Sequence, residues 1–281
     1  MIKDKAKIND SFEPFFYQRL SPEAETNPMK EKLYTIPLNE AVDAHDECPI
    51  CFIERKLEQD TIDFVLGNSS SYMESDVRAD TDEAGFCRKH FQKMYDYGNS
   101  LGNAWILKTH YRKKIDEMKK VFQQVSPSKG SFKLFKKPAA EGENPLVDWI
   151  HKENESCYIC NRFKDTYDRY MDTFFYLYRE DSEFHDKILN SKGFCLTHFG
   201  DLCEAADKYL KPDERDRFYK EMETLMTENM ERIYEDVSWF IEKYDYRNRD
   251  ADWKNSRDAI QRGMQNMKGG YPADPIYRPQ K

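Results

Sequence analysis

Cysteine and histidine residues recur in two matched sets along this 281-residue chain. The first set reads Cys48-x2-Cys51 followed by Cys87-x2-His90, and the second reads Cys157-x2-Cys160 followed by Cys195-x2-His198. The two Cys-x-x-Cys pairs are offset by 109 positions and the two Cys-x-x-His pairs by 108, so a single deletion relates the copies. The flanks also agree, because both copies contain Cys-x-Ile-Cys and Gly-Phe-Cys-x-x-His-Phe. We infer an internal repeat.

Thiolate and imidazole groups at this spacing are typical zinc ligands. Structural zinc sites are tetrahedral and fill all four positions with protein ligands. A Cys-x-x-Cys pair at the start of a helix directs two sulfurs to one point, and the i, i+3 spacing of Cys-x-x-His places both side chains on one helical face. We therefore expect one Cys3His site within each copy and two structural zinc ions per chain. Exchange of ligands between the copies stays open.

The cysteines have three other interpretations. Reduced, buried cysteines are common in proteins, but the paired spacing and its duplication make that interpretation the weaker one. A redox role for Cys48-Pro-Ile-Cys51 requires a βαβ context, which the sequence does not indicate, and the second copy lacks the proline. Iron–sulfur ligation is the third alternative, less favoured than zinc, and sequence alone does not separate the two.

The repeated motifs resemble those of an uncharacterised bacterial family known only as a domain of unknown function. Its members pair a Cys-Pro-x-Cys with a later Gly-Phe/Leu-Cys-x-x-His. The resemblance covers roughly residues 33 to 250 and includes Ser71-Tyr72-Met73-Glu74 before the first Gly-Phe-Cys. It implies a helical fold and metal ligation at the eight cysteine and histidine positions, and it implies no particular activity.

The hydrophobic pattern predicts helices and no strand. Helices are expected over 51–66, 72–79, 157–178 and 218–244. A shorter helix is expected to follow residue 178 and to end at 189. A long amphipathic helix is expected over 101–125, where apolar residues step by three and four: Leu101, Ala104, Leu107, Tyr111, Ile115, Met118, Phe122 and Val125. The expected fold is therefore all-α, with two tandem helical repeats that are each organised around a Cys3His site.

Composition suggests five segments. Residues 1–32 are polar and proline-containing and are expected to form an extended arm. The first repeat is assigned to 33–125, a linker to 126–145 and the second repeat to 146–245. Residues 246–281 are rich in Arg, Asp, Asn and Gly and are expected to form a C-terminal tail.

Charge and hydropathy indicate a soluble protein. The net charge is −8, and no apolar run approaches the roughly 18 residues of a spanning helix. The first residues lack the apolar core of a secretory signal, so a cytoplasmic location without membrane contact is expected. In that reducing compartment clustered cysteines favour metal binding over disulfides.

One segment departs from the acidic average. Residues 105–137 contain nine lysines and one arginine against two carboxylates, a net of +8. Candidate contacts to nucleic acid or another partner lie on the expected long helix: Lys108, Arg112, Lys113, Lys119 and Lys120. The alternative is that these charges only form a solvated helix face without a binding role, and we favour this alternative somewhat over partner binding.

No catalytic residue is assigned. The sequence has no glycine-rich phosphate loop and no Gly-x-Ser-x-Gly motif. The favoured function is a non-enzymatic, zinc-stabilised helical scaffold that binds a protein partner. The alternatives are binding of RNA or another phosphate-rich partner through 105–137, and a zinc–thiolate redox sensor in which oxidation ejects the metal.

Overall fold

The computed structural model describes residues 28–69, 71–125, 144–270 and 272, and all their regular elements are helices. The all-α prediction is confirmed. The first half contains α1 (Pro28–Asp43), α2 (Pro49–Leu66), η1 (Ser71–Met73), α3 (Ser75–Ala84), α4 (Arg88–Tyr97) and α5 (Ser100–Val125). The second half contains α6 (Pro145–Glu155), α7 (Tyr158–Glu180), α8 (Ser182–Leu189), α9 (Leu196–Tyr209) and α10 (Pro212–Glu242), and then η2 (Tyr246–Asn248), η3 (Ser256–Asp258) and α11 (Ala259–Lys268).

The helix boundaries follow local chemistry. Pro49, Pro145 and Pro212 occupy the first turns of α2, α6 and α10, where a missing backbone N–H costs nothing. The turns before α4 and α9 contain Gly85 at φ 59° and Gly193 at φ 72°. These left-handed conformations favour glycine, which explains why the Gly-Phe-Cys motif begins with it in both copies.

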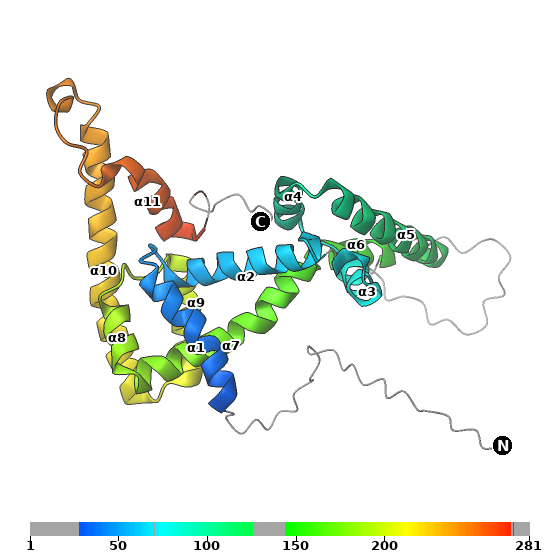
Figure 1. Ribbon diagram of the computed structural model, residues 1–281, viewed down its shortest axis with the longest axis horizontal. Helices are drawn as coiled ribbons and strands as arrows, with labels where there is room; N and C mark the ends of the chain where they lie inside the picture. Colours follow the sequence, from blue (N-terminus) through cyan, green and yellow to red (C-terminus); the bar gives the residue numbers. More distant parts are fainter. Residues whose placement is uncertain (1–27, 70, 126–143, 271, 273–281) are drawn as a thin grey trace, which may run out of the picture.

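Helices α2 and α7 form the centre of the molecule and run in opposite directions (Figure 1). The start of α2 lies beside α9, and the start of α7 lies beside α4. Each helix therefore spans the distance between the two ends of the fold. The two Cys-x-x-Cys pairs lie at the N-termini of these two helices.

Two hydrophobic cores lie at opposite ends of this helix pair. The larger core combines α1 and the start of α2 with α7 to α10 and includes Leu38, Ile53, Phe174 and Phe218. The smaller core combines the end of α2 with η1, α4, α5 and the start of α7. Residues 38–53 from the first half thus pack with the second half, so the cores do not coincide with the repeats.

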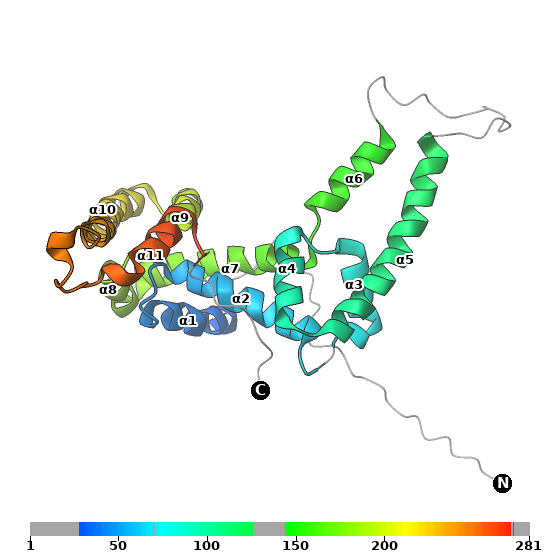
Figure 2. The same ribbon diagram turned by 90° about the horizontal axis from the view of Figure 1, so that it is seen from above.

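The long helix expected over 101–125 is present as α5, but its apolar stripe does not face a core. Its buried residues are Gly102 and Ile106, near its start. Tyr111, Ile115 and Phe122 are 63, 47 and 49% exposed. Helix α5 packs against α6, and the two project together from the rest of the molecule (Figure 2).

The segment assigned to a C-terminal tail contains helix α11, which the sequence did not predict. It packs against α9 and α10, and its residues Ala259, Gln265 and Asn266 are buried. The N-terminal arm expected over 1–32 lies outside the described residues up to position 27, but residues 28–32 are helical and begin α1, so the arm was assigned too far along the chain. The expected linker lies outside the described residues over 126–143. Within the described ranges, no helix is long and apolar enough to cross a membrane.

Candidate metal centres

The eight predicted ligands form two quartets, and each quartet joins the two halves of the chain. Centre A consists of Cys48, Cys51, Cys195 and His198, and centre B consists of Cys87, His90, Cys157 and Cys160. In each quartet the four ligand atoms lie within 4.8 Å of one another. The prediction of one site within each repeat is therefore wrong. Every Cys-x-x-Cys pair meets the Cys-x-x-His pair of the other copy.

Helix length explains the exchange. Helix α2 has 18 residues, so it moves the chain about 27 Å away from Cys48 and Cys51. The following helix, α3, has only 10 residues, about 15 Å, and does not return that far. Cys87 therefore lies near the far end of α2, where the antiparallel α7 begins. In the second copy α7 has 23 residues and α8 only 8. Helix α7 therefore also moves the chain farther from its Cys-x-x-Cys pair than the following helix can return it.

The distances between ligand atoms match those around one tetrahedral ion. Around zinc, two sulfurs lie about 3.8 Å apart, and a sulfur and a nitrogen about 3.6 Å apart. In centre A the Cys51 and Cys195 sulfurs are 3.7 Å apart, and the His198 Nδ1 atom lies 3.2–3.5 Å from the three sulfurs.

Centre B has the same arrangement. The Cys87 and Cys160 sulfurs are 4.0 Å apart, and His90 Nδ1 lies 3.1–3.4 Å from the three sulfurs. Both quartets therefore have the residue types and the spacing to hold a metal ion. No disulfide joins their cysteines, which are all free.

Each motif begins at a helix N-terminus. Cys48, Cys87, Cys157 and Cys195 are the residues that cap α2, α4, α7 and α9. In centre A the Cys48 sulfur accepts a hydrogen bond from the Cys51 backbone, and the Cys195 sulfur accepts one from the His198 backbone, both at 3.4 Å. The unpaired N–H groups and the helix dipole stabilise negative charge at such positions. Two helix N-termini therefore converge on each centre and favour its thiolates.

Carboxylates on α2 reach both histidines. The Nε2 atom of His90 lies 2.8 Å from Glu58 Oε1, a hydrogen bond that leaves Nδ1 directed at the sulfurs. Glu58 is buried and also pairs with Lys89 and Lys93. One turn earlier, Glu54 Oε2 lies 3.6 Å from His198 Nε2. Carboxylates that orient metal-bound histidines in this way are a regular feature of zinc sites.

These two carboxylates were missed by the sequence analysis. Acidic residues are abundant in the chain, and nothing in their spacing distinguishes Glu54 and Glu58. The second copy uses another group at the matching place. Tyr167, which is 109 positions after Glu58, lies with its ring 6.2 Å from that of His198 and donates a hydrogen bond to Asp201.

The two centres differ in their access to solvent. All three cysteines of centre A are fully buried, and His198 is 5% exposed. In centre B, by contrast, Cys160 is exposed and Cys87 is half-buried. A metal ion in centre B would therefore be within reach of small molecules in solution.

Helix α11 accounts for the burial of centre A. A Cβ atom added at Gly269, just after α11, would lie 3.6 Å from the Cys195 sulfur and 3.7 Å from the Cys51 sulfur. The helix is fixed there by Gln265, which donates a hydrogen bond to Asp46, and by Asn266, which donates one to the Phe194 carbonyl. These contacts hold α11 against the chain segments that lead into both motifs of centre A.

Ionisation in the metal-free protein is uneven within each quartet. Burial raises the pKa of the Cys48 thiol, whereas hydrogen bonds from Cys48 and Cys51 lower the pKa of Cys195 to about 4. In centre B burial opposes ionisation of Cys157, but its hydrogen bond with His90 prevails and lowers the pKa of Cys157 to about 6. Each quartet thus holds a thiolate next to groups that are still protonated, and a metal ion must displace those protons.

His90 is one of the protonated groups. Its burial favours the neutral ring, but its hydrogen bonds with Cys157 and Glu58 outweigh burial and raise the pKa of His90 to about 9. At neutral pH the metal-free imidazole therefore carries protons on both ring nitrogens and a positive charge. Coordination through Nδ1 requires that the Nδ1 proton be lost.

The candidate partner contacts are spread along α5 and do not lie at either centre. Lys108 lies over the Trp105 ring at 4.5 Å, and Lys113 forms an ion pair with Glu83. Lys119 and Lys120 are exposed, as is Arg112. Together they form an exposed, basic helix face whose binding role stays a prediction.

Comparison with known proteins places the chain in a family. Neither the curated proteins nor the solved structures include a match to it. A family model described as "Family of unknown function (DUF6062)" matches residues 29–274, most of the chain. This span includes both quartets and all the helices from α2 to α11. The family resemblance inferred from the motifs is confirmed: the chain belongs to the family of unknown function DUF6062.

Proposed function

We propose that the protein is a non-enzymatic helical scaffold that two zinc ions stabilise and that binds a protein partner through α5 and α6. The observation that carries the proposal is the exchange of ligands between the two halves. An ion in either centre joins the start of α2 or α7 to a motif that is more than 60 residues away in sequence. One such ion joins the start of α2 to the start of α9, and the other joins the start of α7 to the start of α4, so the two halves are connected at both ends of the antiparallel helix pair.

The compactness of the quartets favours zinc over an iron–sulfur cluster. In a cluster the protein ligands bind different iron atoms, so they are farther apart than ligands of a single ion. All four ligand atoms of each centre lie within 4.8 Å, as a single ion requires. The Cys3His composition is also common among structural zinc sites.

The closed ligand sets support a structural role. Catalytic zinc sites keep one position for water or substrate, whereas three thiolates and one imidazole complete the tetrahedron here. Structural zinc contributes on the order of 10–16 kcal/mol in zinc-finger peptides. That is comparable to the whole stability of a domain, so loss of both ions is expected to unfold much of this protein.

Helices α5 and α6 offer the surface for a partner. Tyr111, Ile115, Met118 and Phe122 form an exposed apolar stripe at helical spacing, and exposed lysines and Arg112 lie beside it. Val147 and Ile150 on α6 are also exposed, at 44 and 43%. Extended apolar patches rimmed by charge are characteristic of protein interfaces. The complementary partner is a protein surface with apolar residues flanked by acidic ones.

Elemental analysis and affinity capture test the two parts of this proposal. Elemental analysis should find two zinc ions per folded chain, and a metal-free chain that folds cooperatively would refute the structural role. A partner retained by the wild type should be lost from Ile115→Ser/Phe122→Ser. Tyr234→Ser/Ile241→Ser likewise removes one exposed aromatic and one exposed aliphatic residue, here from α10, and should retain it. Equal loss from both variants would contradict the assigned surface.

A zinc–thiolate redox sensor is a second candidate, and the exposure of Cys160 favours it. Hydrogen peroxide would accept two electrons from the Cys87 and Cys160 thiolates, whose sulfurs are 4.0 Å apart. A disulfide would form between them, the peroxide would become two hydroxide ions, and the zinc ion would leave. Release of one zinc ion from the wild type together with a Cys87–Cys160 disulfide found by peptide mass mapping, at peroxide levels that spare a control protein, would support it, and release without that disulfide would contradict it.

RNA binding through the basic face is the remaining alternative. It requires affinity that falls steeply with salt and that Lys119→Glu/Lys120→Glu abolishes. Lack of binding to bulk RNA at low salt would eliminate it.

A further inference from the structure

A charged pocket of about 550 Å³ lies where α10, η3 and α11 meet the segments that precede the two motifs of centre A. Its lining includes five cationic side chains: Lys192, Arg232, Lys254, Arg257 and Arg262. The only carboxylates among its lining residues that the structure describes are those of Glu47 and Asp258. In a chain of net charge −8 this is a marked local excess of positive charge.

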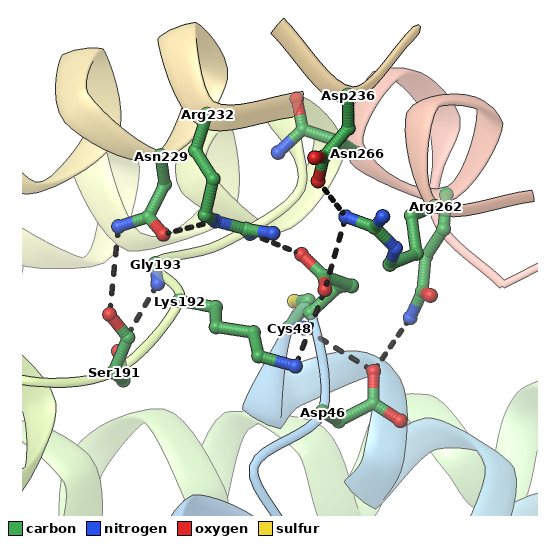
Figure 3. A network of polar contacts seen from close by, with 12 residues as sticks. Asp46, Cys48, Ser191, Lys192, Gly193, Asn229, Arg232, Asp236, Arg262 and Asn266 are labelled. Atoms are coloured by element: carbon green, nitrogen blue, oxygen red, sulfur yellow. Dashed lines mark hydrogen bonds and ion pairs between the residues drawn. The ribbon is translucent and has the colours of Figure 1, made fainter. Parts of the chain in front are cut away.

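The floor of the pocket is electrically balanced. Glu47 is 5% exposed, and its carboxylate lies 2.5 Å from Arg232 and 3.3 Å from Lys192. Arg262 pairs with Asp236 on α10 at 2.9 Å (Figure 3). It also pairs with Asp258 at 2.9 Å. These ion pairs hold the guanidinium groups in fixed positions. They use three carboxylates for three cations.

The rim of the pocket is not balanced. Lys254 and Arg257 are exposed, and neither has a carboxylate within 4.0 Å among the described residues. Lys254 lies over the Trp239 ring at 4.4 Å, and Arg257 lies over the Trp253 ring at 6.0 Å. Contacts with aromatic faces orient a cation without neutralising it. The pocket therefore carries two uncompensated positive charges at its opening.

The backbone at the rim is also unusual. Lys254 has φ 50°, a left-handed conformation that residues other than glycine adopt at a cost. Its N–H group is held by Asp252 Oδ1 at 2.7 Å. This local contact holds the lysine in place beside the pocket.

We propose that this pocket binds a phosphate-bearing small molecule, with Lys254 and Arg257 as its main contacts. A phosphate dianion matches the two uncompensated charges. Guanidinium groups bind phosphate oxygens in a bidentate fashion, with charge-assisted hydrogen bonds. The fixed Arg232 and Arg262 side chains form the wall behind the site. The volume of about 550 Å³ also leaves room for a group attached to the phosphate.

Inorganic phosphate is the probe that tests the site. Titration of the metal-loaded, full-length protein at low ionic strength should give saturable binding of one phosphate per chain by calorimetry. Tryptophan fluorescence should change with the same midpoint, because Trp239 and Trp253 contact the two rim cations. Lys254→Ala/Arg257→Ala should weaken binding about tenfold or more. The two side chains are exposed, so the variant should keep its fold and both metal ions.

A matched control separates a site from general attraction. Lys119→Ala/Lys120→Ala removes the same charge from exposed positions on α5 and should bind phosphate as the wild type does. Non-saturating signals, or equal weakening in both double variants, would show that the anion is attracted only by overall charge and would overturn the proposal. This test is independent of the zinc and partner proposals, because neither involves Lys254 or Arg257.

Discussion

Glu58 and His90 are joined by a hydrogen bond of 2.8 Å at the point where the first half of the chain meets the start of α7. The bond fixes the imidazole with Nδ1 toward Cys87, Cys157 and Cys160. It also connects the two centres mechanically. Helix α2 carries Cys48 and Cys51 of centre A at its start and Glu58, which supports centre B, two turns farther along.

The first prediction concerns this support. Glu58→Gln keeps the size of the side chain but removes the negative charge that orients His90 and increases its basicity. Such changes typically cost about 10–100-fold in metal affinity. Competition with a chromophoric chelator should show that loss at centre B, with centre A unchanged. Glu54→Gln is the matched variant and should weaken centre A less, because Glu54 is 3.6 Å from His198. Equal affinity of wild type and Glu58→Gln would refute the role.

The order of metal loss is the second prediction. Centre B contains an exposed cysteine and a half-buried one, whereas the cysteines of centre A are fully buried. A chelator in excess should therefore remove one zinc ion quickly and the other slowly. The fast phase should be absent from Cys87→Ser, which removes a ligand of centre B. A single phase with an amplitude of two ions would contradict the difference between the centres.

Gly269 gives a third prediction, for the cover over centre A. Its φ of 82° and ψ of 176° are accessible almost only to glycine. Gly269→Ala is expected to destabilise the end of α11 by about 1–3 kcal/mol. The slow phase of zinc release should become faster while the fast phase stays the same. Gly200, on α9, is the control: a Cβ there meets nothing within 4 Å, and Gly200→Ala should leave both phases unchanged.

The dependence of metal affinity on pH is the fourth prediction. In the metal-free protein burial raises the pKa of Cys48, and partial desolvation of the sulfur together with the neighbouring Cys157 raises the pKa of Cys160, although that residue is exposed. Hydrogen bonds raise the pKa of His90 to about 9. These groups are protonated at neutral pH and must lose their protons to bind metal. Affinity should therefore fall as the pH is lowered from 8.5 to 6.5, by about tenfold per pH unit for each proton released. Calorimetry in two buffers counts these protons, and an affinity independent of pH would contradict the assignment.

The sequence predicted which residues form the centres but not how they pair. Duplicated spacing identified all eight ligands, because only a few residue types and intervals bring four donors to one ion. Both copies carry the same Cys-x-x-Cys and Cys-x-x-His motifs, so the sequence alone does not decide which Cys-x-x-Cys pair shares a metal ion with Cys87. The choice depends on the length and direction of α2 and α3, which bring Cys87 to Cys157 and Cys160. The hydrophobic periodicity that predicts α2 does not indicate in which direction the helix runs relative to α7.

Other differences have similar physical causes. The apolar stripe of α5 was visible in the sequence, but periodicity shows only that a helix has an apolar face and not what covers it. Ile115 and Phe122 are accordingly exposed. Helix α11 was missed because it is short and polar. Its buried side chains include Gln265 and Asn266, which are held by hydrogen bonds rather than by a hydrophobic pattern.

The central claim is that each metal ion joins the two halves of the chain, and counting metal ions in two double variants tests it most directly. Cys51→Ser/Cys195→Ser removes two ligands of centre A, and Cys51→Ser/Cys87→Ser removes one ligand from each centre. Native mass spectrometry should find one zinc ion in the first variant and none in the second. If the sites formed within the repeats, the first variant would contain none and the second would keep one. That reversed result would contradict the account.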